Sequence, residues 1–149
     1  MTNPTVREFL AADLDALENR DGQQSNPELT VLQSMRGPAF TAVADGRVIG
    51  CGGVAVLWEG FGACWMILAD DIGSHGLWLS KTTMQFLQNV KRDLRLHRLE
   101  ATALHESVRN QKWLELCGFT REQNGVAQQY LADRRSIVRY EIVEDACKP

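Results

Sequence analysis

The pattern of hydrophobic and polar positions changes character about forty residues into the chain. Before that point apolar residues are sparse, with a short edge strand predicted at 5–9 and leucines at helical spacing over 10–17. Residues 25–27, Ser-Asn-Pro, have the form of a helix start, a capping residue followed by proline, and predict a short helix that runs to Met35. The first part of the chain is therefore expected to be mainly helical.

A β-hairpin is the sharpest local signal in the chain. Residues 40–44 and 47–58 are two β-prone runs, and Asp45-Gly46 between them favours a two-residue turn, because both central residues need a positive φ. Cys51-Gly52-Gly53 in the middle of the second run would weaken its pairing. We therefore expect a bulge or a close approach of the backbone at these glycines.

Further strands and helices follow the hairpin. A turn at 59–62 leads into the nearly continuous apolar run Ala63–Ala69, which indicates a central strand covered on both faces. In the later part of the chain, the spacing of apolar residues alternates between that of a helix and that of a strand. It predicts a helix at 80–94 with Ser80 as N-cap, a strand at 98–104, a helix at 107–116 with Gly118 as C-cap, and a strand at 136–143.

This order predicts an α+β fold with a largely antiparallel sheet. One parallel crossover joins the strands 63–69 and 98–104, and a functional site is expected near it. The helix between these strands is expected to turn one apolar face to the sheet. That face consists of Met84, Leu87, Val90 and Leu94.

Length and composition are those of an ordinary single-domain protein. The 149 residues suffice for one hydrophobic core, with 44% hydrophobic and 23% charged residues. A net charge of −3 gives no field to attract a phosphate backbone, which disfavours nucleic-acid binding. No apolar run approaches about 18 residues, and the first residues do not form a signal peptide. We therefore expect a cytoplasmic protein that does not bind membranes.

The four cysteines, at 51, 64, 117 and 147, show no Cys-x-x-Cys spacing. Cys51, Cys64 and Cys117 each lie inside an apolar run, which favours buried reduced thiols. A zinc site or a disulfide framework is the alternative. The tryptophans at 58, 65 and 113 also lie in apolar stretches and are expected in the core, whereas Trp78 could line a groove or fill a cofactor site.

Three stretches between Phe40 and Ile142 resemble the GNAT superfamily of acyl-CoA-dependent N-acyltransferases. They are the hairpin 40–58 with the strand 63–69, the strand–loop–helix 65–94, and the helix 108–117 that closes in Leu116-Cys117-Gly118-Phe119. The resemblance implies a single GNAT-like three-layer domain over 1–149, with a helical N-terminal part at 1–39 and the sheet core and cofactor motif at 40–149. A narrower resemblance is to small GNAT-like proteins of tailed bacteriophages, carried by residues 50–53, 64–68 and 113–119.

The resemblance implies acetyl-CoA as cofactor. In this family a strand hydrogen-bonds the pantetheine arm, and a loop at a helix N-terminus presents N–H groups to the pyrophosphate. The motif R/Q-x-x-G-x-G/A falls on residues 75–80, with His75 at the cationic position and Trp78 and Ser80 at the later small positions. The implied cofactor-binding residues are Met66, Ile67, Leu68, His75, Gly76, Leu77, Trp78, Leu79, Ser80, Lys81 and Asn110.

The catalytic residues that the resemblance implies differ from the family pattern. Leu114 stands where many members place a tyrosine that protonates the leaving thiolate. Direct attack of an amine on a thioester needs a base and a polarised carbonyl. The base is expected to be Asp70 or Asp71 at a strand end, or His105 at the end of the neighbouring strand. Each of these residues could instead be an ordinary solvated or capping residue.

Two functions remain open from the sequence. The first is an N-acyltransferase that transfers an acetyl group from acetyl-CoA to a small-molecule or protein amine. The second is a catalytically inactive GNAT-fold protein, phage-encoded and located in the host cytoplasm, that acts through protein–protein interaction. A homodimer is compatible with either, and neither involves nucleic acid, membrane or metal.

Overall fold

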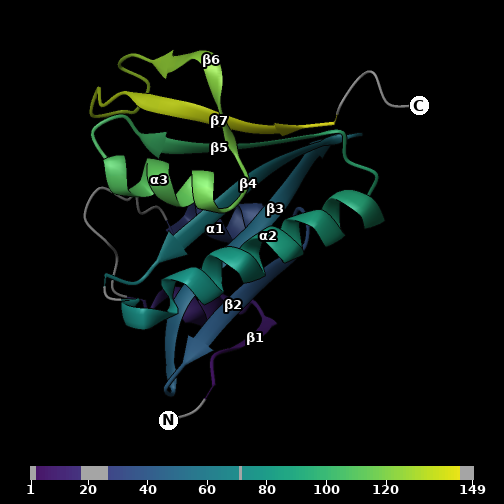
Figure 1. The fold of residues 1–149 in the computed structure, drawn as a ribbon, viewed down its shortest axis with the longest axis vertical. Helices are drawn as coiled ribbons and strands as arrows, with labels where there is room; N and C mark the ends of the chain where they lie inside the picture. The colour runs from purple at the N-terminus through teal and green to yellow at the C-terminus, as the bar shows by residue number, and fades with distance from the viewer. Residues whose placement is uncertain (1–2, 18–26, 71, 145–149) are drawn as a thin grey trace.

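Seven strands form one mixed sheet in the order β1-β2-β3-β4-β5-β7-β6, and the computed structural model describes it within residues 3–17, 27–70 and 72–144 (Figure 1). The strands are β1 Thr5–Glu8, β2 Ala39–Ala44, β3 Arg47–Trp58, β4 Phe61–Leu68, β5 Arg98–Leu104, β6 Thr120–Ala127 and β7 Ile137–Val143. All neighbours pair antiparallel except β4 and β5, which are parallel. This confirms the predicted α+β class and its single parallel pair.

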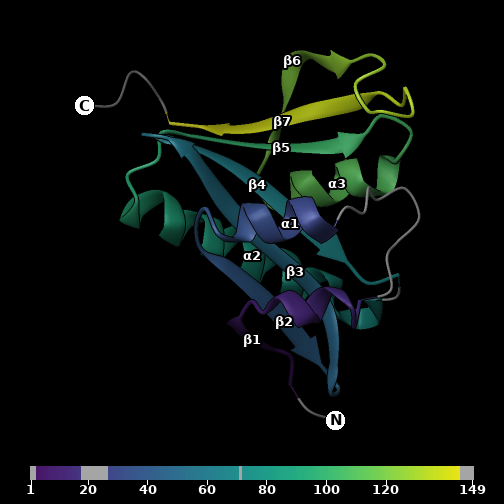
Figure 2. The same ribbon diagram turned by 180° about the vertical axis from the view of Figure 1, so that it is seen from behind.

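Helices cover both faces of the sheet and give the three layers of the fold. They are the 3-10 helices η1 Ala11–Leu14 and η2 Gly73–His75, and the α-helices α1 Pro27–Ser34, α2 Gly76–Asp93 and α3 Val108–Leu116. Figure 1 shows α2 and α3 in front of the sheet, and Figure 2 shows η1 and α1 on the opposite face. Within the described residues, no helix has both the length and the hydropathy that a membrane span requires.

The β2–β3 hairpin confirms the predicted turn. Of the two alternatives predicted for the glycines, a bulge or a close approach of the backbone, the structure shows the close approach. Asp45 and Gly46 adopt φ of 53° and 75°, which the two-residue turn requires. The irregularity in the β2–β3 register lies between Ala42 and Val43, not at the predicted glycines. The backbone does approach closely at Gly53, where a Cβ would stand 2.8 Å from both the Pro38 carbonyl oxygen and Trp65 Nε1.

The helix α2 begins at Gly76, so the prediction of Ser80 as its N-cap was wrong. Ser80 is buried within the helix, and its hydroxyl donates to the carbonyl of Leu77. The buried face consists of Leu79, Ser80, Thr83, Leu87 and Val90, whereas Met84 and Leu94 are 37% and 45% exposed. Small polar residues take two core positions because they let the helix lie close to the sheet, and a count of apolar residues does not detect them.

Two further sequence predictions need correction. The strand β6 was not predicted, because Thr120–Ala127 is polar, largely exposed and without alternation. Trp58 was expected in the core but is 62% exposed, and its ring stacks on Phe61 at a centroid distance of 4.3 Å. It lies at the end of β3, beyond the part of the sheet that the helices cover.

The structure confirms Gly118 just past the end of helix α3, and it shows Ser107, predicted as the first residue of the helix, as its N-cap. The amide of Asn110 donates to the hydroxyl of Ser107, the N-cap residue, at 3.3 Å. Gly118, just beyond the helix, adopts a φ of 101°, which glycine tolerates better than other residues. The proposed cap residues Ser25 and Asn26 of the first helix and Cys147 lie outside the described residues.

Asp13 connects the N-terminal part of the chain to the sheet through hydrogen bonds. Its carboxylate accepts hydrogen bonds from both Nη atoms of Arg7, at 2.6 and 2.8 Å, and from the amide of Leu10 at 2.9 Å. It also accepts from the hydroxyl of Thr41 in β2 at 2.7 Å. Asp13 is only 6% exposed. The hydrogen bonds, above all those from Arg7, lower the pKa of Asp13 to about 2, although burial acts against them.

Candidate functional site

The strands β4 and β5 pair over only three residues and then separate. Phe61–Ala63 of β4 is in register with Arg98–Glu100 of β5, and no pairing between the two strands follows. Both strands continue, to Leu68 and to Leu104. Figure 1 shows them meeting at one end and diverging toward the other. In the described structure, the backbone of β4 beyond Ala63 therefore has a strand neighbour on the β3 side but none on the β5 side.

A cavity of about 360 Å³ occupies the opening between the diverging strands. Side chains alternate between the faces of a strand, and residues of both faces line this cavity, which therefore reaches through the sheet. The helices and loops contribute Leu29, Thr30 and Gln33 of α1, Thr83, Phe86 and Leu87 of α2, Asn110, Trp113 and Leu114 of α3, with Cys117, Tyr130 and Leu131. The strands contribute Phe40, Gly52, Gly53, residues 64–68, residues 101–104 and Ile137.

Two polar atoms in the cavity wall are buried without a hydrogen-bond partner among the described residues. They are the indole Nε1 of Trp65 and the hydroxyl Oγ1 of Thr83. A buried donor that makes no hydrogen bond is costly, and such groups are rare in folded proteins. Both atoms belong to residues that line the cavity, but each atom is itself covered by protein.

Four of the predicted cofactor-binding residues meet at this cavity. Met66, Ile67 and Leu68 lie on the unpaired stretch of β4, and Asn110 lies in the first turn of α3. The Ser107 cap fixes the position of Asn110 at the start of that helix. The structure thus brings together two predicted groups that are more than forty residues apart in the sequence.

The remaining predicted cofactor-binding residues, 75–81, do not line the cavity but form the start of α2. His75 is turned toward the β2–β3 hairpin, with its Nε2 at 3.5 Å from Oδ2 of Asp45. Trp78 is half-buried and packs against the core, so it does not fill the cavity. Gly76, Leu77, Leu79, Ser80 and Lys81 complete the start of the helix, and its first-turn N–H groups have no partner within the helix. This N-terminus is the place where the fold could hold an anion.

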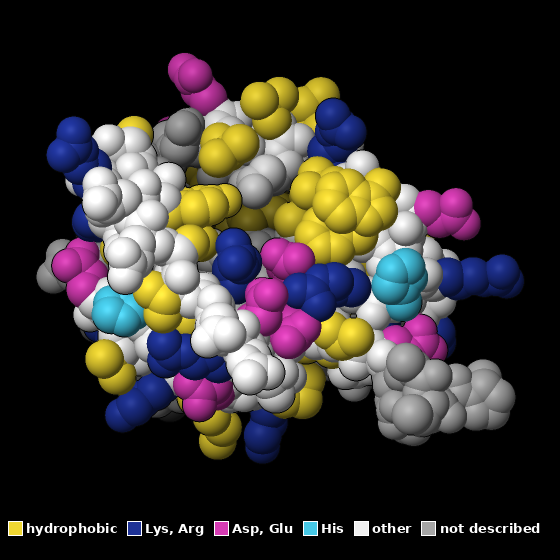
Figure 3. Space-filling model, turned by 90° about the horizontal axis from the view of Figure 1, so that it is seen from above, with side chains coloured by type: hydrophobic (Ala, Val, Ile, Leu, Met, Phe, Trp, Pro, Cys, Tyr) yellow, Lys and Arg dark blue, Asp and Glu magenta, His cyan; other side chains and the backbone are white. Residues whose placement is uncertain are grey.

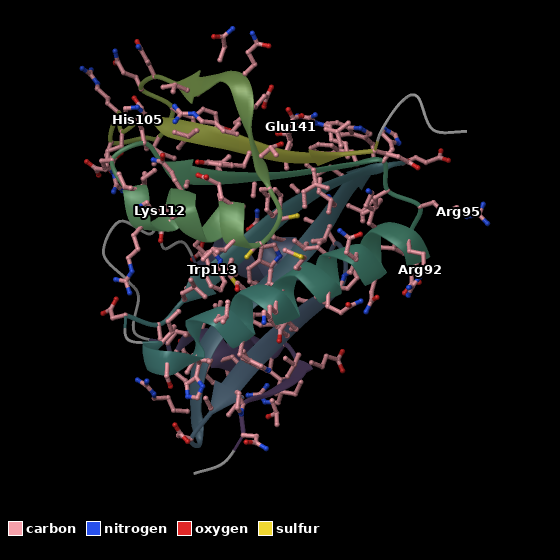
Figure 4. The ribbon with its side chains drawn as sticks, viewed as in Figure 1. Arg92, Arg95, His105, Lys112, Trp113 and Glu141 are labelled. Atoms are coloured by element: carbon pink, nitrogen blue, oxygen red, sulfur yellow. The ribbon has the colours of Figure 1, made fainter. Side chains whose placement is uncertain are left out.

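Neither of the predicted bases lines the cavity. Asp70 is exposed just beyond β4, and His105 is exposed just beyond β5. His105 is tied to its surroundings through the backbone, where its amide donates to the Ser136 carbonyl. Figure 4 shows His105 at the outer end of β5, whereas Trp113 points from α3 toward the interior. Asp71 lies outside the described residues.

Sequence reasoning missed several residues of the cavity wall, among them Gln33, Thr83 and Tyr130. Thr83 lies one helical turn after Leu79 on the buried face of α2, so helical spacing could have indicated it. Gln33 and Tyr130 come from α1 and from the loop before β7. No local pattern connects these distant segments with the diverging strands.

Charged side chains near the end where β5 pairs with β4 form ion pairs with one another. The guanidinium of Arg98 lies 3.0 Å from Glu100, 2.6 Å from Glu141 and 3.7 Å from Glu122. Arg139 is 3.4 Å from Glu122. Figure 3 shows mixed basic and acidic side chains on this side of the molecule, beside hydrophobic side chains that surround a hollow. In the described part of the chain, no group of three or more His, Cys, Asp or Glu side chains is arranged to hold a metal ion.

The described cysteines are free thiols. Cys51 and Cys117 are buried and Cys64 is half-buried, and none of the three forms a disulfide. Burial raises the pKa of Cys51 to about 11 and that of Cys117 to about 12, and it also raises the pKa of Cys64. These thiols are therefore protonated and unreactive at neutral pH.

The structure was compared with known proteins. No protein-family model matches the sequence, and a search of curated proteins finds no match. Solved structures do match. Ard1 from Thermoplasma volcanium has a TM-score of 0.77 and 13% identity, over 95% of this chain and 98% of its own. The ribosomal-protein-S5-alanine acetyltransferase from Vibrio fischeri has a TM-score of 0.71 and 16% identity, over 100% and 97%.

A third similar structure is a GNAT family acetyltransferase from Elizabethkingia anophelis with acetyl-CoA bound. Its TM-score is 0.71 at 14% identity, over 96% of this chain and 99% of its own. At identities of 13–16% these similarities concern the fold alone. They extend over nearly the whole of each chain. The chain therefore has the fold of the GNAT acetyltransferases.

Proposed function

We propose that this protein is an acyl-CoA-dependent N-acyltransferase that transfers an acetyl group to an amine. The observation that carries the proposal is the unpaired stretch of β4 beside a cavity that passes through the sheet. Such a strand edge offers N–H and C=O groups at regular intervals to an extended ligand with amide groups. A pantetheine arm is a ligand of this kind.

The residues present fit acetyl-CoA in two places. In the cavity, the backbone of Met66–Leu68 would bind the pantetheine arm, with Asn110 on the opposite wall. At the start of α2, the N–H groups of residues 76–79 would bind the pyrophosphate, with Lys81 adding positive charge.

Acetyl-CoA would supply an acyl group activated as a thioester. In the transfer, the amine nitrogen forms a bond to the thioester carbon and the carbon–sulfur bond breaks. The nitrogen loses one proton and the sulfur gains one. We propose Asp70 and His105 as the groups that exchange protons with the reactants through water. Asp70 and His105 both lie at the wide end of the opening between β4 and β5, because these strands diverge toward their carboxyl ends.

Calorimetric titration with acetyl-CoA tests the proposal. We expect saturable binding, and we expect Thr83→Leu, which fills the cavity, to weaken it by about tenfold or more. Thr82→Leu is the matched control, because Thr82 is the neighbouring residue on the same helix and does not line the cavity. Its affinity should equal that of the wild type. Thermal unfolding of both variants checks that each is folded.

The opposite outcome would favour the second hypothesis. If the folded wild-type protein gives no binding heat at about 1 mM acetyl-CoA, the proposed acyl transfer is wrong. A non-catalytic protein that uses the same fold for binding another protein would then explain the chain better.

A further inference from the structure

The wall of the cavity between β4 and β5 is uncharged. None of the described residues that line it is Asp, Glu, His, Lys or Arg. Its ionisable side chains are those of Cys64, Cys117 and Tyr130, and burial raises the pKa of both thiols. Among the described residues, the wall therefore offers no carboxylate to hold an ammonium group, and no carboxylate or imidazole to deprotonate one.

The carboxylates on the adjoining part of the sheet do not supply a free partner for an ammonium group in the cavity. Glu100 and Thr102 are two residues apart on β5, so they point to the same face, and Thr102 lines the cavity. The Glu100 carboxylate is 3.0 Å from the guanidinium of Arg98, which also pairs with Glu141 at 2.6 Å. Glu100, Glu122 and Glu141 share the two guanidinium groups of Arg98 and Arg139, which leaves one net negative charge outside the residues that line the cavity. A cationic ligand would have to compete with an arginine for these carboxylates.

A protonated alkyl amine suits such a cavity poorly. Amines of the lysine type have pKa values near 10, so roughly one molecule in a thousand is uncharged at pH 7. Moving the ammonium form into an uncharged cavity without a partner is costly. An amine attached directly to an aromatic ring is uncharged at neutral pH, because its lone pair is delocalised into the ring. Such an amine needs no base before it attacks.

The aromatic side chains of the cavity wall also favour an amine attached to an aromatic ring. Five aromatic side chains line the cavity: Phe40, Trp65, Phe86, Trp113 and Tyr130. Aromatic rings bury a large apolar area and prefer offset or edge-to-face contacts with other rings. Gly53 lies directly against Trp65 Nε1, since a Cβ at that position would stand 2.8 Å from the indole nitrogen. The aromatic side chains of the wall, and not this buried donor, are therefore the feature that suits a ring.

We propose that the acyl acceptor is an aryl amine, or another ring-borne amine that is uncharged near neutral pH. This inference rests on the proposed acyl transfer. The neutral nitrogen forms the new carbon–nitrogen bond, the carbon–sulfur bond breaks, and the proton released from nitrogen ends on the thiolate. No protein base has to deprotonate the amine before the attack, which agrees with a wall whose described residues include no carboxylate or imidazole. Asp70 and His105, outside the cavity, would pass the released proton to the sulfur through water.

Two isomers of equal size separate the two kinds of amine. With acetyl-CoA saturating, thiol release and the acetylated product are measured with 4-methylaniline, an aryl amine, and with benzylamine, an alkyl amine. At pH 7 we expect kcat/KM to be about tenfold or more higher for 4-methylaniline, and spermidine to give no product. The benzylamine rate should rise about tenfold per pH unit until its amine is neutral, whereas the 4-methylaniline rate should not.

A carboxylate introduced into the wall should change the preference. Gln33→Glu places one on the α1 side of the cavity and should raise benzylamine kcat/KM relative to 4-methylaniline by about tenfold. Gln88→Glu, the same change on α2 outside this cavity, should leave the ratio unchanged. Equal use of the isomers by the wild type at pH 7, turnover of spermidine, or no transfer to either isomer would overturn the inference. If acetyl-CoA binds in calorimetry, each of these outcomes leaves the proposed cofactor site standing.

Discussion

Asp13→Asn is expected to destabilise the protein and to remove part of its sensitivity to acid. The substitution keeps the size of a side chain that is 6% exposed but removes its charge. Asparagine can still accept from Thr41 or from the Leu10 amide. It cannot form the charged two-point contact that Arg7 makes with both carboxylate oxygens.

The stabilisation that the Asp13 carboxylate contributes follows from the shift of its pKa on folding. The carboxyl has a pKa of about 2 in the folded protein and an ordinary value of 3.8. The difference corresponds to about 2 kcal/mol, since one pKa unit is about 1.4 kcal/mol. Because the folded-state pKa is the lower one, this contribution is complete above the ordinary value and is lost as the pH falls through about 4 toward 2.

Urea unfolding at several pH values measures this effect. At pH 7 the free energy of unfolding of Asp13→Asn should be lower than that of the wild type by about 2 kcal/mol. The two curves should converge as the pH falls to about 2. Asp93→Asn is the control: its carboxylate is an exposed partner of Arg92, and its loss should cost at most about 0.5 kcal/mol. A constant difference between wild type and Asp13→Asn over this pH range would refute the reasoning.

Three further predictions concern the core and the cavity. Thr83→Val removes a buried hydroxyl that has no partner among the described residues and should raise the free energy of unfolding by about 1 kcal/mol, whereas Thr41→Val, which loses the bond to the Asp13 carboxylate, should lower it. Gly118→Ala, at a φ of 101°, should lower the melting temperature, while Gly76→Ala, at a helical φ of −58°, should raise it; equal effects would contradict the backbone explanation. In mass spectrometry after treatment with iodoacetamide at about pH 8, Cys117, whose pKa burial raises to about 12, should be modified only after unfolding, and rapid labelling of the native protein would show that the thiol is accessible.

Local chemistry explains which parts of the fold could be predicted from the sequence. The Asp45-Gly46 turn and Gly118 each depend on residues within a few positions, so their signals are present in a short window. The strand β6 has no such signal, because one edge strand exposed to water has no need of alternating apolar residues. The start of α2 was misplaced because Ser80, a common capping residue, is buried within that helix.

Met66–Leu68 and Asn110 were implied by the resemblance to the GNAT superfamily, and the structure places them at the cavity. The order of elements indicated only that a site lies near the parallel pair of strands. The uncharged character of the wall depends on side chains from α1, α2 and the loop before β7 together. It also depends on the exposed positions of Asp70 and His105, which no pattern of neighbouring residues reveals.

The three-residue pairing between β4 and β5 divides the sheet into two halves that share few backbone hydrogen bonds. Strands β1–β4 form one half and β5–β7 the other. Within the described residues they are joined by the pairing of 61–63 with 98–100 and by two hydrogen bonds from the amides of His97 and Arg98 to the Gly60 carbonyl. In hydrogen exchange, amides next to this junction should therefore open at lower free energy than those inside either half. A ligand seated between the strands would touch both halves at once. Its binding would make the two parts unfold as one cooperative unit.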